Sequence, residues 1–296
     1  MIKARRVTFD WATTPLHWVP DDAFTTHVIN VLHLLLPAGE KWFCDVFRQA
    51  LPLVGDGPLR DEAKGFIGQE AVHARAHSLV LDHLAAQGLD TAAYTARVDW
   101  MFERLLGDHG LGEGHGPRGL RRRWLVTRLA MVAAIEHFTC VLGYWALSGS
   151  AALDHAGADP TMLDLLRWHG AEEVEHRAVA FDLYQRLGGG YLRRVVVMAG
   201  VVPVILGLWI LGTHYLVDHD PEAGPNDHPS VWRFFKVSRG TGRLPTPGYL
   251  MSSIPRYLRP SHHPSQEAST EEALAYLARS PAARDYAREA GGRSSW

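Results

Sequence analysis

The residues best suited to chemistry in this sequence are glutamates and histidines at helical spacing. Glu70-Ala-Val-His73 and Glu173-Val-Glu-His176 each place a carboxylate and an imidazole three residues apart. Residues at i and i+3 lie on one face of a helix, so both side chains of a pair can reach the same metal ion. The 14 glutamates and 17 histidines of this 296-residue chain predict fewer than one such pair by chance.

A further glutamate stands upstream of each pair, in an apolar stretch: Glu40 in PAGEKWF and Glu136 in VAAIEHF. The alternative interpretation is that these glutamates are surface charges on amphipathic helices. It fits Glu136 least, because an unpaired carboxylate in apolar surroundings is costly to bury. Carboxylates and imidazoles suit iron and manganese, and four carboxylates neutralise two divalent cations. The pattern therefore predicts a dinuclear metal centre, with Glu136 and Glu173 as the expected bridging carboxylates.

Neighbouring residues extend this predicted centre. His169 lies four residues before Glu173 on the same face, and we expect it to be a further ligand, with a hydrogen-bonding role as the alternative. Other residues are expected to contact the ligands rather than the metal: His77, Glu172 and Tyr144. We expect Cys44 and Cys140, each four residues after a proposed ligand, to line the inner face.

Long amphipathic helices must position these residues. The periodicity predicts helices over 23–50, 59–87, 91–106, 119–147 and 160–187, with no convincing strand pattern. Pro37 is expected to restart the first helix, Gly88 to end the second, and Asp159-Pro160 to begin the last. Glutamates and Glu-x-x-His pairs projecting inward from four helices are typical of a ferritin-like four-helix bundle, so we predict an all-α fold of this type.

One extra helix is apolar throughout. Residues 195–216 contain no Asp, Glu, Lys or Arg, which makes them a transmembrane candidate. Pro203 and three glycines favour instead a kinked helix that is buried or docked on a membrane surface. We expect residues 1–220 to form one helical metal-binding domain. Residues 221–296 are expected to form an extended Pro-rich arm with short helices.

Composition narrows the functional classes. The formal net charge of −2 argues against a nucleic-acid partner bound through its phosphates. Two cysteines cannot build a disulfide framework, and the N-terminus lacks the apolar stretch of a secretory signal. We therefore expect a cytoplasmic protein, with membrane association through 195–216 and a homodimer as further expectations.

Four strings carry a family resemblance: PAGEKWF, FIGQEAVHARAH, AAIEHFTC and RWHGAEEVEHRAVAFDLY. Over about residues 5–220 the chain resembles a bacterial family catalogued as predicted metal-dependent hydrolases. The ligand pattern also resembles ferritin-like di-iron oxygenases, among them the arylamine N-oxygenases. The positions that match their ligand set are Glu40, Glu70, His73, Glu136, His169, Glu173 and His176.

The ligand set leads us to expect a di-iron oxygenase. Such an oxidoreductase would use two iron ions, O2 and an electron donor to hydroxylate, desaturate or N-oxygenate a small amine or apolar substrate. Manganese is the alternative metal. A two-metal hydrolase of an ester or phosphate is the alternative function, with Arg75 and Arg177 as the nearby cationic candidates. A non-catalytic iron- or oxygen-sensing protein is the second alternative.

Overall fold

The computed structural model describes residues 2–108, 118–224 and 227–293. Within these ranges every regular element is helical, which confirms the all-α prediction.

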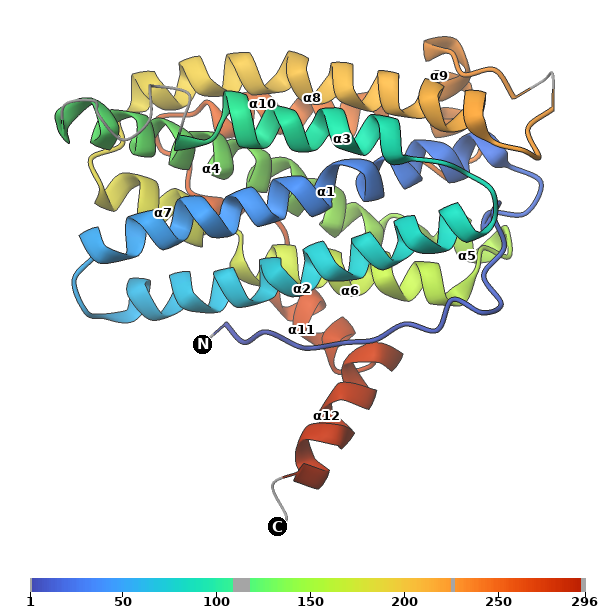
Figure 1. The fold of residues 1–296 in the computed structure, drawn as a ribbon, viewed down its shortest axis with the longest axis horizontal. Helices are drawn as coiled ribbons and strands as arrows, with labels where there is room; N and C mark the ends of the chain where they lie inside the picture. Colours follow the sequence, from blue (N-terminus) through green and yellow to red (C-terminus); the bar gives the residue numbers. More distant parts are fainter. Residues whose placement is uncertain (1, 109–117, 225–226, 294–296) are drawn as a thin grey trace.

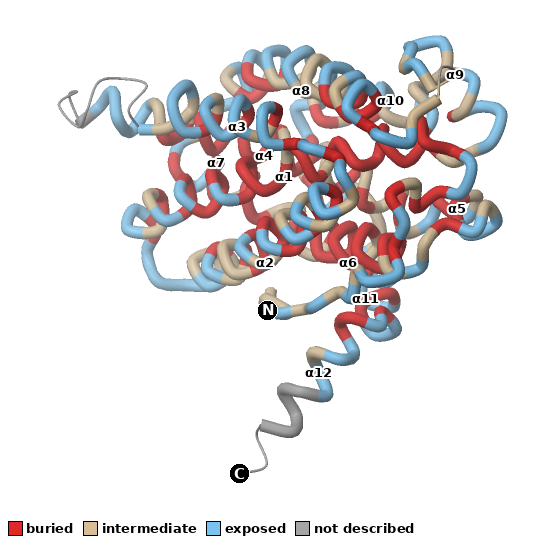
Figure 2. The backbone as a smooth tube through the Cα atoms, turned by 45° about the vertical axis from the view of Figure 1, so that its right-hand side comes forward, coloured by how far each residue is buried: buried red, intermediate tan, exposed pale blue. Residues whose placement is uncertain are grey.

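Four long helices form the body of the molecule and run side by side (Figure 1). They are α1 (Ala23–Ala50), α2 (Pro58–Ala86), α4 (Arg118–Ser148) and α6 (Pro160–His176). The most extensive helix pairings join α1 to α2 and α4 to α6. Figure 2 shows their inward faces buried and their outward faces exposed. The chemistry-bearing residues of the sequence therefore lie on elements that share one core.

The helix ends follow local sequence rules, with two exceptions. As predicted, Gly88 (φ +92°) follows the end of α2, and the Asp159 side chain accepts a hydrogen bond from the Met162 N–H at the start of α6. The prediction that Pro37 restarts a helix is wrong, because α1 continues through it. The helix predicted over 160–187 is two helices, since α6 ends at His176 and α7 spans Val179–Arg186.

Two glycines allow α4 and α6 to cross closely. A Cβ at Gly143 would lie 2.6 Å from the Gly170 Cα, and a Cβ at Gly170 would lie 2.7 Å from the Gly143 Cα. Both distances are shorter than real Cβ contacts, so the two backbones touch at this point. Glu136 lies two turns before this crossing and Glu173 one turn after it, and donor atoms of the two carboxylates lie within 4.8 Å of each other.

The apolar helix α8 (Tyr191–His219) covers α1 and α4 and continues through Pro203. Within the described ranges, two helical segments are long and apolar enough to cross a membrane. Gly119–Ser148 is 67% buried in its most apolar window, whereas Tyr191–His219 is only 17% buried. Of the two alternatives expected for 195–216, burial against the fold holds for one side of α8 only, and the other side is exposed (Figure 2).

The remaining helices are short. They are α3 (Ala92–Trp100), α5 (Ala151–His155), α9 (Val231–Gly240), α10 (Pro247–Tyr257), α11 (Thr270–Leu277) and α12 (Pro281–Arg293). α11 packs on α6, where the Tyr276 hydroxyl donates to Asp164 at 2.8 Å, while α12 projects away from the body (Figure 1). The division into a domain over 1–220 and an arm over 221–296 stays a prediction.

Candidate metal centre

The seven residues predicted as ligands converge inside the molecule. α1 supplies Glu40, α2 supplies Glu70 and His73, α4 supplies Glu136, and α6 supplies His169, Glu173 and His176. All seven are buried, none more than 5% exposed. Their assignment as ligands stays a prediction.

One cluster surrounds His176 at the C-terminal end of α6. The Nε2 atom of His176 lies 3.1 Å from Glu136 Oε2, 3.3 Å from Glu70 Oε1 and 3.5 Å from Glu173 Oε1. The donor atoms of these four residues all lie within 4.8 Å of one another. Three carboxylates and one imidazole therefore face a common point.

A second cluster adjoins the first around His73 and His169. His73 Nδ1 lies 3.6 Å from Glu70 Oε1 and 3.4 Å from Glu173 Oε1. His169 Nε2 lies 2.9 Å from Glu173 Oε1 and 3.5 Å from Glu40 Oε1. Glu70 and Glu173 contribute donor atoms to both clusters, whereas Glu136 contributes to the cluster around His176 alone. The geometry thus favours Glu70 with Glu173 as the shared carboxylates, in place of the expected Glu136 with Glu173.

Buried polar atoms without a hydrogen-bond partner indicate whether this donor set fits two cations. Both carboxylate oxygens of Glu40, Glu70 and Glu136 are buried without a hydrogen-bond partner among the described residues, and so are His73 Nδ1 and His176 Nε2. Buried polar atoms are normally satisfied, and leaving a carboxylate without a partner costs several kcal/mol. Divalent cations would satisfy these atoms together, so the donor set fits two metal ions.

The ionisation of the carboxyl groups agrees with this fit. Burial and the charges of Glu173 and Glu70 raise the pKa of Glu136 to about 8, and burial with the charge of Glu70 raises the pKa of Glu40 well above its ordinary range. Burial also opposes ionisation of Glu173, but the charge of His176 and a hydrogen bond from His169 outweigh it and hold the pKa of Glu173 well below its ordinary range. Like charges this close need a compensating positive charge.

A hydrogen bond from the opposite side orients His73. Its Nε2–H donates to Glu172 Oε2 at 2.9 Å, which leaves Nδ1 free to face the cluster. Glu172 in turn accepts from the Arg5 guanidinium at 2.7 Å, so the buried carboxylate is neutralised by the N-terminal segment. Partners of this kind fix the tautomer of a metal-binding imidazole and raise its basicity.

His176 is oriented in the same manner through an amide. Its Nδ1–H donates to Gln69 Oε1 at 3.0 Å, and the Gln69 amide donates to Glu175 Oε2 at 2.8 Å. Arg5 also donates to Glu175, at 2.8 Å. One arginine therefore anchors the hydrogen bonds behind both imidazoles.

A row of histidines backs His169. His77 Nε2 and His169 Nδ1 are 2.9 Å apart, and His77 Nδ1 lies 2.7 Å from His33 Nδ1. If His169 presents Nε2 to a metal, its Nδ1–H donates to His77. Burial and the charge of His169 lower the pKa of His77 well below its ordinary range and that of His33 to about 3, so both are neutral partners.

Other predicted or candidate residues lie further out. The Tyr144 hydroxyl donates to Glu272 on α11 at 3.4 Å rather than to a residue of the cluster. Arg75 is exposed, and Arg177 donates to the Pro264 carbonyl and Thr270. Cys140 is buried and lines a cavity of about 130 Å³ with Tyr144 and with Tyr249 and Arg256 of α10.

Three residues of the network were missed by sequence reasoning: Arg5, Gln69 and His33. Arg5 lies 167 residues from Glu172 in the chain, and no local signal indicates such a pair. Gln69 directly precedes Glu70, and His33 lies two turns before Glu40, so helical spacing could have indicated His33. Spacing cannot indicate Gln69, whose role depends on α6 lying opposite.

Fold and site together define an all-α protein with a buried carboxylate–imidazole centre built to hold metal. A family model described as predicted metal-dependent hydrolase matches residues 3–268, so the chain belongs to this family. The resemblance to this family noted in the sequence is thereby confirmed. No curated protein and no solved structure matches the chain.

Family membership corrects the expected function. The prediction of a di-iron, O2-dependent oxidoreductase is wrong, because the family is one of predicted metal-dependent hydrolases and matches the alternative hydrolase function. The error has a physical reason: carboxylates and imidazoles serve both redox-active and hydrolytic metal pairs, so the ligand set alone does not select the chemistry. Metal dependence is the part of the expectation that holds.

Proposed function

We propose that this protein is a two-metal hydrolase of a small ester or phosphate. The observation that carries the proposal is the pair of adjoining clusters, in which buried oxygens and nitrogens on four helices have no hydrogen-bond partner. Membership of a family of predicted metal-dependent hydrolases supports the choice of reaction. Hydrolysis consumes water, so it needs no electron donor.

The residues proposed to hold the two cations are Glu40, Glu70, His73, Glu136, His169, Glu173 and His176, with Glu70 and Glu173 shared. Mn²⁺ and Fe²⁺ both suit this donor set. Two bound cations would polarise the carbonyl or phosphoryl oxygen of a substrate and generate a nucleophile from water. We infer that α1, α2, α4 and α6 form a bundle of the ferritin-like type around them.

The chain's own residues would orient the centre and keep it dry. Phe66 packs edge-on against His176 at 4.8 Å between ring centroids, and Trp168 packs against His73 at 5.1 Å. These rings exclude water from the backs of two proposed ligands, which strengthens electrostatic interactions within the site.

Metal-dependent hydrolysis can be measured directly. The metal-free protein is reloaded with Mn²⁺, Fe²⁺ or Zn²⁺, its metal content is determined, and nitrophenyl esters and phosphodiesters are supplied anaerobically. We expect turnover that requires metal and is lost in Glu173→Gln, while Glu271→Gln, an exposed glutamate on α11, retains it. Two metals per chain with no hydrolysis of either substrate class would refute the proposal.

A further inference from the structure

The outward face of α8 is apolar from Leu192 to Leu211, and polar side chains are exposed beyond it, at His214 and Asp218. Outward-facing residues follow one another at intervals of three or four, as a single helix face requires. They are Leu192, Val196, Ala199, Pro203, Leu206 and Ile210, all exposed. Leu192 is 75% exposed, Val196 63% and Leu206 57%. Contiguous exposed apolar surface of this extent marks a contact with a partner or a membrane.

The inward face of α8 is tied to the rest of the fold along its length. Val197, Met198 and Leu216 are buried. The Trp209 indole N–H donates to the Val28 carbonyl at 2.9 Å, and the Tyr94 hydroxyl donates to the Leu208 carbonyl at 2.6 Å. A helix held in this way cannot leave the body to cross a bilayer without breaking these contacts. It can, however, meet a bilayer lengthwise.

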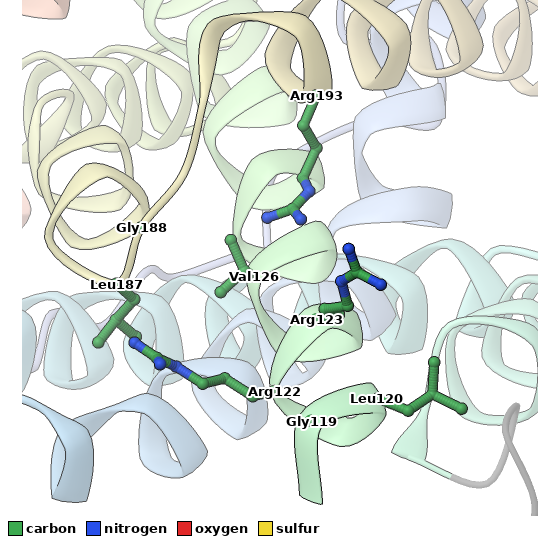
Figure 3. Close-up of a pocket in the computed structure, with 8 residues that line it drawn as sticks. All are labelled: Gly119, Leu120, Arg122, Arg123, Val126, Leu187, Gly188 and Arg193. Carbon is green, nitrogen blue, oxygen red and sulfur yellow. The ribbon is translucent and has the colours of Figure 1, made fainter. Parts of the chain in front are cut away.

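Arginines gather in a hollow at the N-terminal end of α8. A cavity of about 620 Å³ lies between the start of α4 and the segment leading into α8, and Arg122, Arg123 and Arg193 line it with Leu120 and Leu187 (Figure 3). No acidic side chain is among the described residues that line this cavity. Guanidinium groups bind phosphate oxygens well, so the cavity is complementary to an anionic headgroup.

An exposed tryptophan stands beyond the other end of α8. α9 lies past the C-terminal end of α8, on the same side of the molecule in both views (Figures 1 and 2). On α9, Trp232 is 82% exposed and Val231 is 58% exposed, and Lys236 is also exposed. Tryptophan and lysine at the edge of an apolar face are typical of a membrane–water interface.

We propose that α8 docks the protein lengthwise on an anionic phospholipid bilayer. The apolar face enters the boundary between headgroups and acyl chains, and the arginine cavity takes a headgroup phosphate. Charge complementarity favours an anionic bilayer over a second copy of this chain. A second copy would either place its own arginines opposite those of the cavity or leave the cavity arginines without an anionic partner. The proposal is independent of the hydrolytic function.

Vesicle flotation tests the docking with the full-length protein. We expect the protein to float with vesicles of phosphatidylcholine and phosphatidylglycerol, and to float less with phosphatidylcholine alone. Leu206→Glu should lower the apparent affinity roughly tenfold or more, since it removes apolar area and adds a charge. Leu274→Glu, an exposed leucine on α11 at 46% exposure, is the matched control and should bind as the wild type does.

The arginine cavity is tested separately. Each arginine near a charged surface contributes about a fivefold factor in binding, so Arg122→Gln with Arg193→Gln should weaken binding to anionic vesicles on the order of twentyfold. Binding to neutral vesicles should change little. Circular dichroism checks that every variant is folded.

Absence of flotation, or flotation unchanged by Leu206→Glu, overturns the proposal. So does a dimer in solution that Leu206→Glu converts to a monomer without any vesicle binding.

Discussion

At the scale of single residues, the geometry of the candidate centre depends on which nitrogen each imidazole turns toward the carboxylates. His73 presents Nδ1 because its Nε2–H is held by Glu172, and His176 presents Nε2 because its Nδ1–H is held by Gln69. Three roles are thus divided among side chains: facing the cluster, orienting an imidazole, and neutralising the orienting carboxylate. Substitutions should separate these roles.

The shared carboxylates should matter more for metal content than the unshared one. We expect Glu70→Gln to lose both metals, because Glu70 contributes to both clusters, and Glu136→Gln to lose about one. Metal per chain after loading with Mn²⁺ and gel filtration measures this, with Glu271→Gln as the control. Equal losses in the two variants would contradict the assignment of Glu70 as a shared ligand.

The carboxylate behind His73 should affect affinity rather than stoichiometry. Removing such a partner lowers metal affinity about 10- to 100-fold, and we expect this of Glu172→Ala. Glu172→Gln should lose less, because its amide oxygen still accepts from His73. Competition with a coloured chelator gives the affinities. If both variants bind metal as tightly as the wild type, Glu172 does not orient a ligand.

At the scale of elements, the crossing of α4 and α6 sets the distance between Glu136 and Glu173. A methyl group at Gly170 would force the helices apart, so Gly170→Ala should cost about 1–3 kcal/mol of unfolding free energy and reduce metal content. Gly200→Ala is the matched control, since nothing lies within 4 Å of a Cβ there and alanine favours a helix. Urea denaturation checks both. A Gly170→Ala variant as stable as the wild type would show that the crossing can widen without cost.

A second contact between elements predicts a pH dependence. Asp220, just after α8, accepts hydrogen bonds from His17 at 2.6 Å and from His27 on α1 at 2.8 Å. Burial raises the pKa of Asp220, but the bonds from His27 and His17 outweigh it and hold this pKa well below its ordinary range. The ionised carboxylate is therefore the form that stabilises the fold.

It follows that the stabilisation by Asp220 is complete above the unfolded-state pKa of about 4 and is lost as the pH falls below it. We expect Asp220→Asn to lower the unfolding free energy by about 2 kcal/mol at pH 7. The difference from the wild type should shrink below pH 4. Urea midpoints across this range measure it, with exposed Asp218→Asn as the control. A difference that grows toward acid pH would have the wrong sign for this explanation.

Prediction from sequence succeeded where the determinants are local in the chain. The spacing of Glu70 with His73 and of Glu173 with His176 placed each pair on one helix face, and Gly88 ended a helix as expected. It failed where distant segments meet. The break after His176 follows no glycine or proline, and the pairing of Arg5 with Glu172 depends on the N-terminal segment lying across α6. The chemistry itself was misassigned, because the same donors serve two reaction classes.

At the scale of the whole molecule, both ends of the chain cover the same part of the core. Toward the C-terminus, α11 packs on α6, and Arg177 donates to Pro264 and Thr270. At the N-terminus, residues 2–9 lie across α2, where a Cβ at Gly65 would come within 2.6 Å of the Ile2 carbonyl oxygen. Both terminal segments therefore pack on α6, the helix that carries three of the proposed ligands.

The N-terminal segment should accordingly contribute more than one arginine. Arg5→Ala leaves Glu172 and Glu175 without their cation, so it should weaken metal binding. Deleting residues 2–9 also removes Phe9, which packs against Trp168 at 5.8 Å between ring centroids. We therefore expect the deletion to lower metal affinity further than Arg5→Ala and to reduce the unfolding free energy as well.

Chelator competition and urea denaturation of the two variants separate these contributions. A deletion of residues 285–296 is the control, because this part of α12 projects away from the body, whereas Ala282 and Ala283 at the start of α12 are buried and Ala282 donates to Asp164 of α6. It should leave metal affinity unchanged. If the deletion of 2–9 binds metal as the wild type does, the charge of Arg5 is dispensable for metal binding. A fall in metal affinity confined to the deletion, with Arg5→Ala unaffected, would instead assign the effect to the packing of Phe9 on Trp168.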